Sequence, residues 1–311
     1  MDPSPFHPDE LTAQVLAGGG PRGSGIRDFM LEQHRAFFAA LPYTFVATLD
    51  EEGWPIATVL EGDPGFVEPL DPVTLRIHAL PAAEDPAAGT IVVGQDVGIL
   101  GIDLGTRRRN RVNGVVSQVD TAFTVAVKQS FGNCPQYIQR RAVRRVETLR
   151  DDPQHLNSLD ARARALIERA DTFLVASRSR TGVGSLGGAD ISHRGGRPGF
   201  VRVEGDTLSI PDFRGNRYFN TLGNLLGEPR ASLLFLDFET GDLLQLQGRV
   251  RIDWSGSAQE WVEGAERVWH FQVTQGWYRA QAAGMRGTFV DYSPVALVTG
   301  VWPARPGDRA S

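Results

Sequence analysis

Four basic or amide side chains in the second half of the chain have the types and spacing of an anion site. Arg197 and Arg202 stand five residues apart at the entry to a predicted strand. Asn216 and Arg217 open a predicted helix over residues 215–226. Unpaired backbone N–H groups at a helix start attract anions, and arginine binds phosphate in a fork as well as by charge. The pattern predicts a site for a small phosphate-bearing ligand, and its structural alternative is a capped helix with solvated arginines.

The elements that would position this site occur twice along the chain. Pro64-Gly65-Phe66-Val67 returns as Pro198-Gly199-Phe200-Val201, and Gly114 returns as Gly248, each 134 residues later. Both stretches consist of short runs rich in Val, Ile, Thr and Phe that are separated by Gly and Pro turns, which is typical of strands. The repeat predicts two copies of one β-rich domain, mainly β with flanking helices (α+β).

We expect four segments along the chain. They are a flexible arm (1–25), copy one (26–134), a helical connector (135–169) and copy two with a C-terminal helix (170–311). Apolar spacing and proline positions predict helices at 26–41, 135–149, 158–169 and between Trp261 and Val273. The aromatic residues of the last helix are interpreted as core rather than as a ligand cage.

The composition excludes several classes of protein. A net charge of -5 with a pI near 5.7 argues against a general nucleic-acid binder. The single cysteine, Cys134, excludes an internal disulfide and a multi-cysteine metal site. No signal-peptide pattern and no apolar run of about 20 residues is present, so we expect a cytoplasmic protein with no membrane partner.

The ordered motifs of residues 171–254 resemble the pyridoxamine 5'-phosphate oxidase-like FMN-binding split-barrel family. The resemblance rests on Arg-x-x-x-x-Arg, Ile-Pro-Asp and the Asn-Arg helix start, followed by Asn224 and Pro229, and it is weaker over residues 41–127. An Asn-Cys-Pro-x-Tyr-Ile string at 133–138 is similar to one in members of this group. The resemblance implies two tandem split β-barrels joined by the helical connector.

The resemblance also implies a cofactor and its ligands. FMN would be bound through its phosphate by the basic and amide residues named first, with Pro211 and Asp212 beside the ring edge. Ser177 and Gln247 are candidates for the pyrimidine side of the ring, although ordinary strand positions are the alternative for the glutamine. His193 is interpreted as a loop histidine rather than a proton donor.

The implied activity is that of an FMN-dependent oxidoreductase, which exchanges hydride through flavin N5 with a small-molecule substrate or an electron donor such as NAD(P)H or a reductase. The alternatives are a non-catalytic flavin-binding partner module, or the same barrel holding a deazaflavin or haem. The tail at residues 302–306 does not match the substrate-binding segment of pyridoxamine phosphate oxidases, so the substrate stays open. We expect a homodimer or an intrachain pseudo-dimer.

Copy one keeps the pattern and loses the charges. It has Glu68 where copy two has Arg202, and an acidic loop with Glu84 and Asp85 in place of the helix start. It is therefore not expected to bind a flavin independently. The run of residues 107–111, rich in arginine, is most simply a solvated hairpin, with an electrostatic handle for an anionic partner as the alternative. Cys134 is interpreted as a buried or substrate-facing residue rather than a nucleophile.

Overall fold

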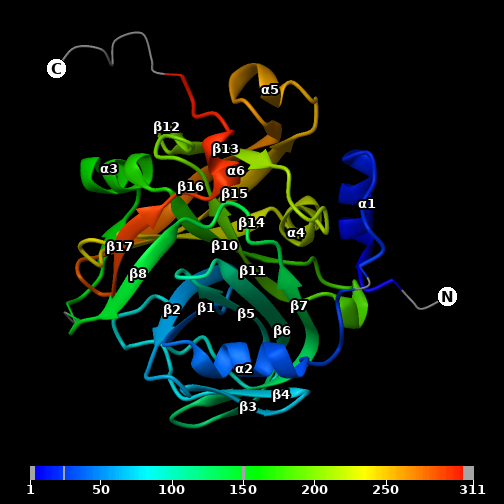
Figure 1. Cartoon of the computed structure of the whole chain (residues 1–311), viewed down its shortest axis with the longest axis vertical. Coiled ribbons are helices and arrows are strands. Elements are labelled where there is room, and N and C mark those ends of the chain that lie inside the picture. Colours follow the sequence, from blue (N-terminus) through cyan, green and yellow to red (C-terminus); the bar gives the residue numbers. More distant parts are fainter. Residues whose placement is uncertain (1–3, 24, 149–150, 304–311) are drawn as a thin grey trace.

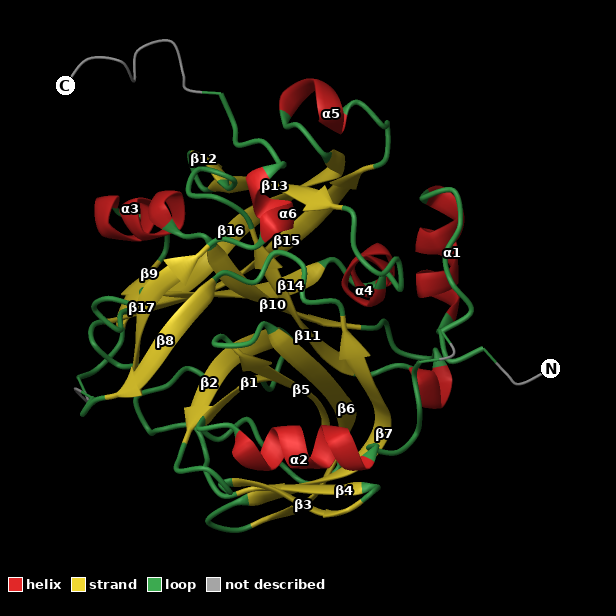
Figure 2. Cartoon of the chain, viewed as in Figure 1, coloured by secondary structure: helices red, strands yellow, loops and turns green. Residues whose placement is uncertain are grey.

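The structure, a computed structural model, describes residues 4–23, 25–148 and 151–303. Two large antiparallel sheets account for most of it, and helices are few and short (Figure 2). The expectation of a mainly β protein with flanking helices is confirmed. Among the described residues, no helix combines the length and apolar character needed to cross a membrane.

The first sheet is built from seven strands in the order β2-β1-β5-β6-β7-β4-β3. Helix α2 (Glu32–Ala40) packs against β3 and buries Phe37 and Phe38 in the core of this sheet. The strands are β1 (Tyr43–Leu49), β2 (Pro55–Glu61), β3 (Val67–Asp71), β4 (Thr74–Ile77), β5 (Asp96–Asp103), β6 (Arg108–Val119) and β7 (Phe123–Asn133).

The second sheet has the equivalent order, β11-β10-β14-β15-β16-β13-β12, with β9 paired to β16 outside this path. Each strand of the first sheet therefore has a counterpart at the same position in the second. The strands are β9 (Gln154–Leu156), β10 (Thr172–Arg178), β11 (Ala189–Gly195), β12 (Arg202–Glu204), β13 (Thr207–Phe213), β14 (Arg230–Leu236), β15 (Leu243–Asp253) and β16 (Ala265–Arg279).

The repeated glycines mark equivalent irregularities in the two sheets. Pairing of β6 with β7 shifts at Asn113/Gly114, and pairing of β15 with β16 shifts at Gln247/Gly248. A Cβ at Gly114 would lie 2.2 Å from a backbone oxygen, and a Cβ at Gly248 would lie 2.3 Å from one. Each bulge therefore requires glycine, and this explains why the residue recurs at that offset.

The two sheets pack against each other through an apolar layer to which both contribute. Phe45 and Leu100 from the first sheet join Leu174 and Leu234 from the second in one buried cluster. Strands β8 (Arg140–Arg145) and β17 (Met285–Asp291), each of which follows the last long strand of its sheet, pair with one another beside this layer (Figure 1). The copies are thus joined by a shared core as well as by the chain.

Two predicted helices are strands in the structure. Residues 140–145, expected within a helix at 135–149, form β8 because they pair with β17; residues 149–150 of that prediction lie outside the described part. The predicted helix between Trp261 and Val273 is confined to α5 (Ala258–Trp261), and the following residues form β16. β-branched and aromatic residues such as Val268, Trp269 and Phe271 suit a strand, and pairing with β13 and β15 decides the outcome. Trp269 is fully buried in the core, as its interpretation required, whereas Trp261 is 54% exposed, so the core interpretation is wrong for that residue.

The other short helices are close to their predicted places, except at the N-terminus. The predictions at 158–169 and 215–226 correspond to α3 (Ala161–Arg169) and α4 (Asn220–Gly227), and a 3₁₀ turn (Gly184–Leu186) and α6 (Pro294–Leu297) complete the described set. The expected flexible arm instead contains α1 (Pro8–Leu16), which packs against α4 (Figure 1). A capping box between His7 and Glu10, with Pro8 in the first turn, explains this helix.

Candidate functional site

A pocket lies between the two sheets and takes residues from both. Its first wall comes from β6, the end of β7 and the segment after it; its second comes from β11, β13, β16 and the start of α4. The lining residues include Arg109, Arg111, Asn133, Tyr137, Ser192, His193, Arg194, Pro211, Asp212, Phe213, Asn216, Arg217, Asn220, Thr221, Glu266 and Arg267.

The first wall contributes two arginines because side chains on a strand alternate. Arg109 and Arg111 are two residues apart on β6, so they project from the same face. Arg111 is 4% exposed, and its guanidinium donates to Asp190 Oδ1 at 2.7 Å and to Ser192 Oγ at 2.6 Å. Asn220 Oδ1 accepts from the same group at 3.3 Å. Arg111 therefore joins β6 of one copy to β11 and α4 of the other.

Positive charge in the pocket exceeds the carboxylates that face it. Burial, together with the neighbouring guanidinium groups of Arg111 and Arg194, lowers the pKa of Arg109 to about 9. Several buried nitrogens of lining residues have no hydrogen-bond partner within the described part of the chain, among them Arg111 Nε, Arg194 Nε, Arg217 Nε and Asn133 Nδ2. Unpaired buried donors are rare in folded proteins, and a cluster of them around a cavity favours an anionic ligand.

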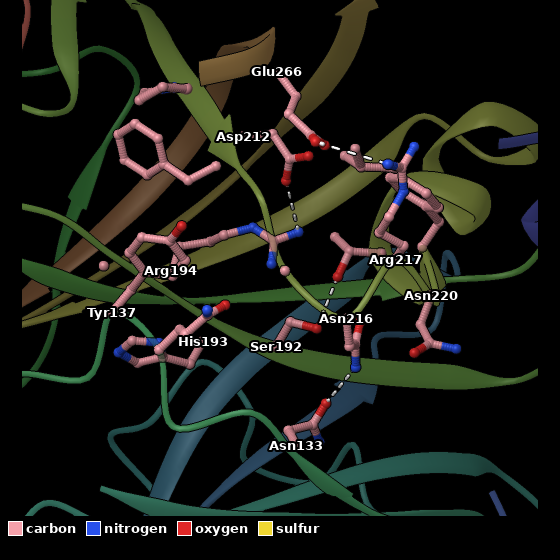
Figure 3. A pocket seen from close by; sticks show the side chains of 18 of the residues that line it. Asn133, Tyr137, Ser192, His193, Arg194, Asp212, Asn216, Arg217, Asn220 and Glu266 are labelled. Atoms are coloured by element: carbon pink, nitrogen blue, oxygen red, sulfur yellow. Dashed lines mark hydrogen bonds and ion pairs between the residues drawn. The ribbon is translucent and has the colours of Figure 1, made fainter. Parts of the chain in front are cut away.

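The second wall orients its cations by ion pairs. Arg194 lies 3.6 Å from Asp212, and Arg217 lies 3.9 Å from Glu266, both of which are too long for strong hydrogen bonds (Figure 3). Asn216 Nδ2 donates to Asn133 Oδ1 at 3.2 Å, and this hydrogen bond connects the second wall to copy one. The two arginines keep nitrogen atoms available to a ligand.

An aromatic pair forms the apolar part of the lining. Tyr137 stacks on Phe213 with ring centroids 5.5 Å apart and planes 24° apart, and its hydroxyl donates to the Arg214 carbonyl. Burial, with the charge of Asp212 nearby, raises the pKa of Tyr137 to about 12. The phenol therefore stays neutral at ordinary pH and serves as a flat wall.

His193 lies on β11 rather than in a loop, which corrects the sequence interpretation. It is 3% exposed, and burial together with the charges of Arg109 and Arg194 holds its pKa well below the usual range. Nδ1 faces Arg109 Nη1 at 3.5 Å, so the ring proton resides on Nε2, which has no partner among the described residues. The imidazole is a neutral donor in the pocket wall.

Half of the site residues predicted from the sequence line this pocket. Pro211, Asp212, Asn216 and Arg217 do so. The other four lie elsewhere. Arg197 donates to the Thr299 carbonyl, Arg202 pairs with Glu204 and lies over Trp302, Ser177 accepts from Asn224, and Gln247 donates to Asp50 and to the Pro55 carbonyl.

The sequence interpretation missed the contribution of copy one. The solvated-hairpin interpretation of residues 107–111 is wrong for Arg111, which is buried, and for Arg109, which donates to the Cys134 carbonyl and lines the pocket. The signal was present in the alternation of arginine with Asn110 and Val112, because a period of two residues is typical of a strand. Arg107, by contrast, pairs with Asp291, and Arg108 lies over the Phe37 ring.

The pairing registers define a counterpart of the pocket on the other side of the pseudo-symmetric core. Leu100 pairs with Arg111 and Leu234 pairs with Gln245, so Gln245 occupies the position of Arg111. By the same register Thr58 corresponds to Ser192 and Arg279 to Asn133. The counterpart therefore combines Thr58 of copy one with Gln245 and Arg279 of copy two.

A carboxylate of the chain itself fills that counterpart. Asp85 is 5% exposed and accepts hydrogen bonds from Thr58 Oγ1 at 2.6 Å, Gln245 Nε2 at 3.1 Å and Arg279 Nη1 at 2.7 Å. Glu68, the other acidic residue singled out from the sequence, is half-exposed on edge strand β3 and pairs with His78. Asp85, rather than Glu68, thus distinguishes the two sides.

Glu10 of α1 accepts a hydrogen bond from Asn220, which lines the pocket, and its pKa predicts an effect of pH on stability. Burial raises its pKa to about 8, although the Asn220 side chain, the His7 backbone and Arg111 oppose this and Asp190 adds to it. A carboxyl with a higher pKa in the folded state binds more protons there, so the contribution of Glu10 to stability is fully present below about pH 4.5 and is lost as the pH rises to about 8. Glu10→Gln removes this titration. Urea unfolding at several pH values is expected to show that the free energy of unfolding of the variant rises relative to that of the unmodified chain between pH 4.5 and about pH 8. An equal pH dependence in the two proteins would contradict the raised pKa of Glu10.

Comparison with known proteins connects this geometry to a family. A family model described as pyridoxamine 5'-phosphate oxidase matches residues 30–158. The resemblance to the pyridoxamine 5'-phosphate oxidase-like family that the sequence indicated is confirmed over these residues. The matched range covers the first sheet, whereas the motifs that suggested this family from the sequence lie mainly in the second.

Solved structures of low similarity accompany this match. HupZ from Group A Streptococcus is 14% identical with a TM-score of 0.29, covering 43% of this chain and 98% of its own. A Clostridium acetobutylicum protein related to general stress protein 26 of Bacillus subtilis is 14% identical with a TM-score of 0.30, covering 42% and 92%. A FAD-binding protein from Mesorhizobium loti is 11% identical with a TM-score of 0.26, covering 40% and 98%. No curated protein matches the chain.

Proposed function

We propose that this chain is an FMN-binding oxidoreductase of the pyridoxamine 5'-phosphate oxidase-like family, with its two sheets arranged as tandem split barrels. One observation carries the proposal: residues of both copies that line one pocket have buried N–H groups without a partner in the described part of the chain. Such donors suit the oxygens of a phosphate monoester, and arginine forms the strongest of these bonds.

The described side chains are suited to such a cofactor. Arg111, Arg194 and Arg217, with Asn133 and Asn216, would bind the phosphate, and the Tyr137–Phe213 pair offers a flat wall for the ring. Bound FMN would supply hydride exchange at N5 with a small-molecule substrate or an electron donor such as NAD(P)H or a reductase. The protein's part is to bind and orient the cofactor and to exclude water.

The arrangement favours one flavin per chain. A family site that elsewhere needs two subunits is here proposed to form between the copies at 26–134 and 170–311, which share an apolar core. The counterpart position contains the Asp85 carboxylate, so it lacks both the space and the charge for a second phosphate. We therefore propose an intrachain pseudo-dimer, and the single cysteine fits the cytoplasmic location that we also propose.

Titration with FMN, followed by quenching of flavin fluorescence, tests the site. Arg194→Ala is expected to weaken FMN binding by roughly 10-fold to 150-fold, the value of one charged hydrogen bond. Arg202→Ala is the matched control, because Arg202 is also a strand arginine of copy two but lies outside the pocket. Its affinity is expected to stay within about twofold, since an arginine that contacts no ligand contributes little to binding.

A larger loss of FMN affinity in Arg202→Ala than in Arg194→Ala would show that the phosphate binds at the strand arginines predicted from the sequence. A chain that takes up no FMN at all would exclude the proposed function. Anaerobic bleaching of the bound flavin by NADPH or NADH tests the oxidoreductase part separately. A flavin that binds and resists both donors favours a partner module that is reduced by another protein.

A further inference from the structure

The turn that carries two pocket residues has an unfavourable backbone conformation. Arg217 and Phe219 have φ values of 59° and 61°, the left-handed region that residues with a side chain seldom adopt. Phe219 is the N-cap of α4 and provides no side-chain cap for the helix. This turn needs contacts from outside itself to hold Arg217 and Asn220 in place.

The N-terminal segment supplies those contacts directly. The Arg217 guanidinium donates to the Ala17 carbonyl, and Gln14 Nε2 donates to the Tyr218 carbonyl at 3.3 Å. The Phe6 ring meets the Tyr218 ring edge-on at 5.5 Å between centroids. Three features of the turn are therefore held by residues 6–17.

The same segment holds the first turn of α4. Glu10 accepts from Asn220 Nδ2, and His7 Nε2 lies 2.8 Å from Asn224 Oδ1; all four side chains are buried. The helices approach so closely at Gly223 that a Cβ there would lie 2.5 Å from the Glu10 Cα. Buried polar bonds fix geometry more strictly than apolar packing, because any other arrangement leaves a polar group unpaired.

We propose that residues 6–17 are a positioning clamp for the phosphate end of the pocket, with Glu10 as its central positioning residue. The inference rests on the proposed function, since the anion it serves is the FMN phosphate. The clamp orders Arg217 and Asn220 before the cofactor arrives, so binding does not have to order them. Glu10 does not line the pocket and acts through Asn220, which in turn orients Arg111.

Comparison of FMN with riboflavin separates this role from a general loss of structure. Riboflavin has the same ring and lacks the phosphate, so the ratio of the two affinities reports on the phosphate end alone. Glu10→Ala is expected to lower the preference for FMN over riboflavin about tenfold, because the phosphate donors lose their orientation. Glu10→Gln, which keeps an acceptor for Asn220, is expected to restore most of that preference.

Two further full-length variants complete the experiment. Gly223→Ala displaces α1 without removing any polar group and is expected to lower the ratio in the same way. Val15→Ala, on the exposed side of α1 with 77% of the residue accessible, is the matched control and should leave the ratio unchanged. Equal loss of FMN and riboflavin binding in Glu10→Ala, or no loss of either, would overturn the clamp. If the unmodified chain binds neither flavin, the proposed function itself fails.

Discussion

Replacement of Arg111 with methionine is expected to lower the free energy of unfolding by about 3 to 5 kcal/mol and to weaken FMN binding by at least about tenfold. The stability loss arises because Asp190, whose side chain is 3% exposed, would lose its ion-pair partner while staying buried. The binding loss arises because Arg111 lines the pocket and has a buried Nε–H that no described residue accepts. Urea unfolding measures the first effect and FMN titration the second.

A double variant separates the two roles of Arg111. Arg111→Met with Asp190→Asn removes both charges and leaves Asn113 and Ser192 near the amide. Removal of both partners of a buried pair is far less costly than removal of one, so most of the stability should return. FMN affinity should stay low. Recovery of full FMN affinity in the double variant would show that Arg111 acts on the fold and not on the phosphate.

Replacement of Asp85 with alanine is expected to lower the free energy of unfolding by a comparable amount, about 3 to 5 kcal/mol. Arg279, whose side chain is 8% exposed, would lose its carboxylate, and Thr58 and Gln245 would lose their acceptor. A second change, Arg279→Met, should recover much of the loss for the same reason as above. Thermal or urea unfolding of the three variants measures these effects.

The matched control for this experiment is Glu68→Ala on copy one. Glu68 and His78 form a solvent-accessible pair, and such pairs contribute about 1 kcal/mol or less. FMN affinity, measured well below the unfolding transition, should be unchanged in both Asp85→Ala and Glu68→Ala because neither residue lines the pocket. A loss of about 3 to 5 kcal/mol in Glu68→Ala, or an unchanged stability in Asp85→Ala, would contradict the assignment of Asp85 as the residue that fills the counterpart of the pocket.

Much of the fold could be predicted from local patterns. Strand-and-turn alternation predicted the β class, and the 134-residue repeat predicted two similar β-rich units, which agrees with two sheets of one strand order. Helix predictions failed where pairing decided the outcome. Residues 140–145 and 265–273 form strands because β17, β13 and β15 offer hydrogen-bond partners, and sequence periodicity alone contains no information about partners.

The predictions of site residues succeeded or failed for the same reason. Asn216 and Arg217 were identified from a predicted helix start, and both line the pocket. The helix itself, α4, begins only at Asn220, so the two residues lie in the turn before it. Arg197 and Arg202 shared the residue type but not the location, since their strand entry faces Thr299 and Trp302. Arg109, Arg111 and Arg194 come from strands on two different sheets, so only the packing of one copy on the other brings them together.

The sequence by itself predicted two β-rich copies, a basic segment next to a helix in copy two, and an acidic loop at the equivalent place in copy one. Those features are local, because residue type and spacing along the chain express them. Only the tertiary structure decided that the pocket lies between the copies and that Arg111 of copy one belongs to it. It also decided that α1 contacts the turn and helix start that carry Arg217 and Asn220. The physical reason is that buried ion pairs and hydrogen bonds between distant segments depend on which surfaces the apolar core brings face to face.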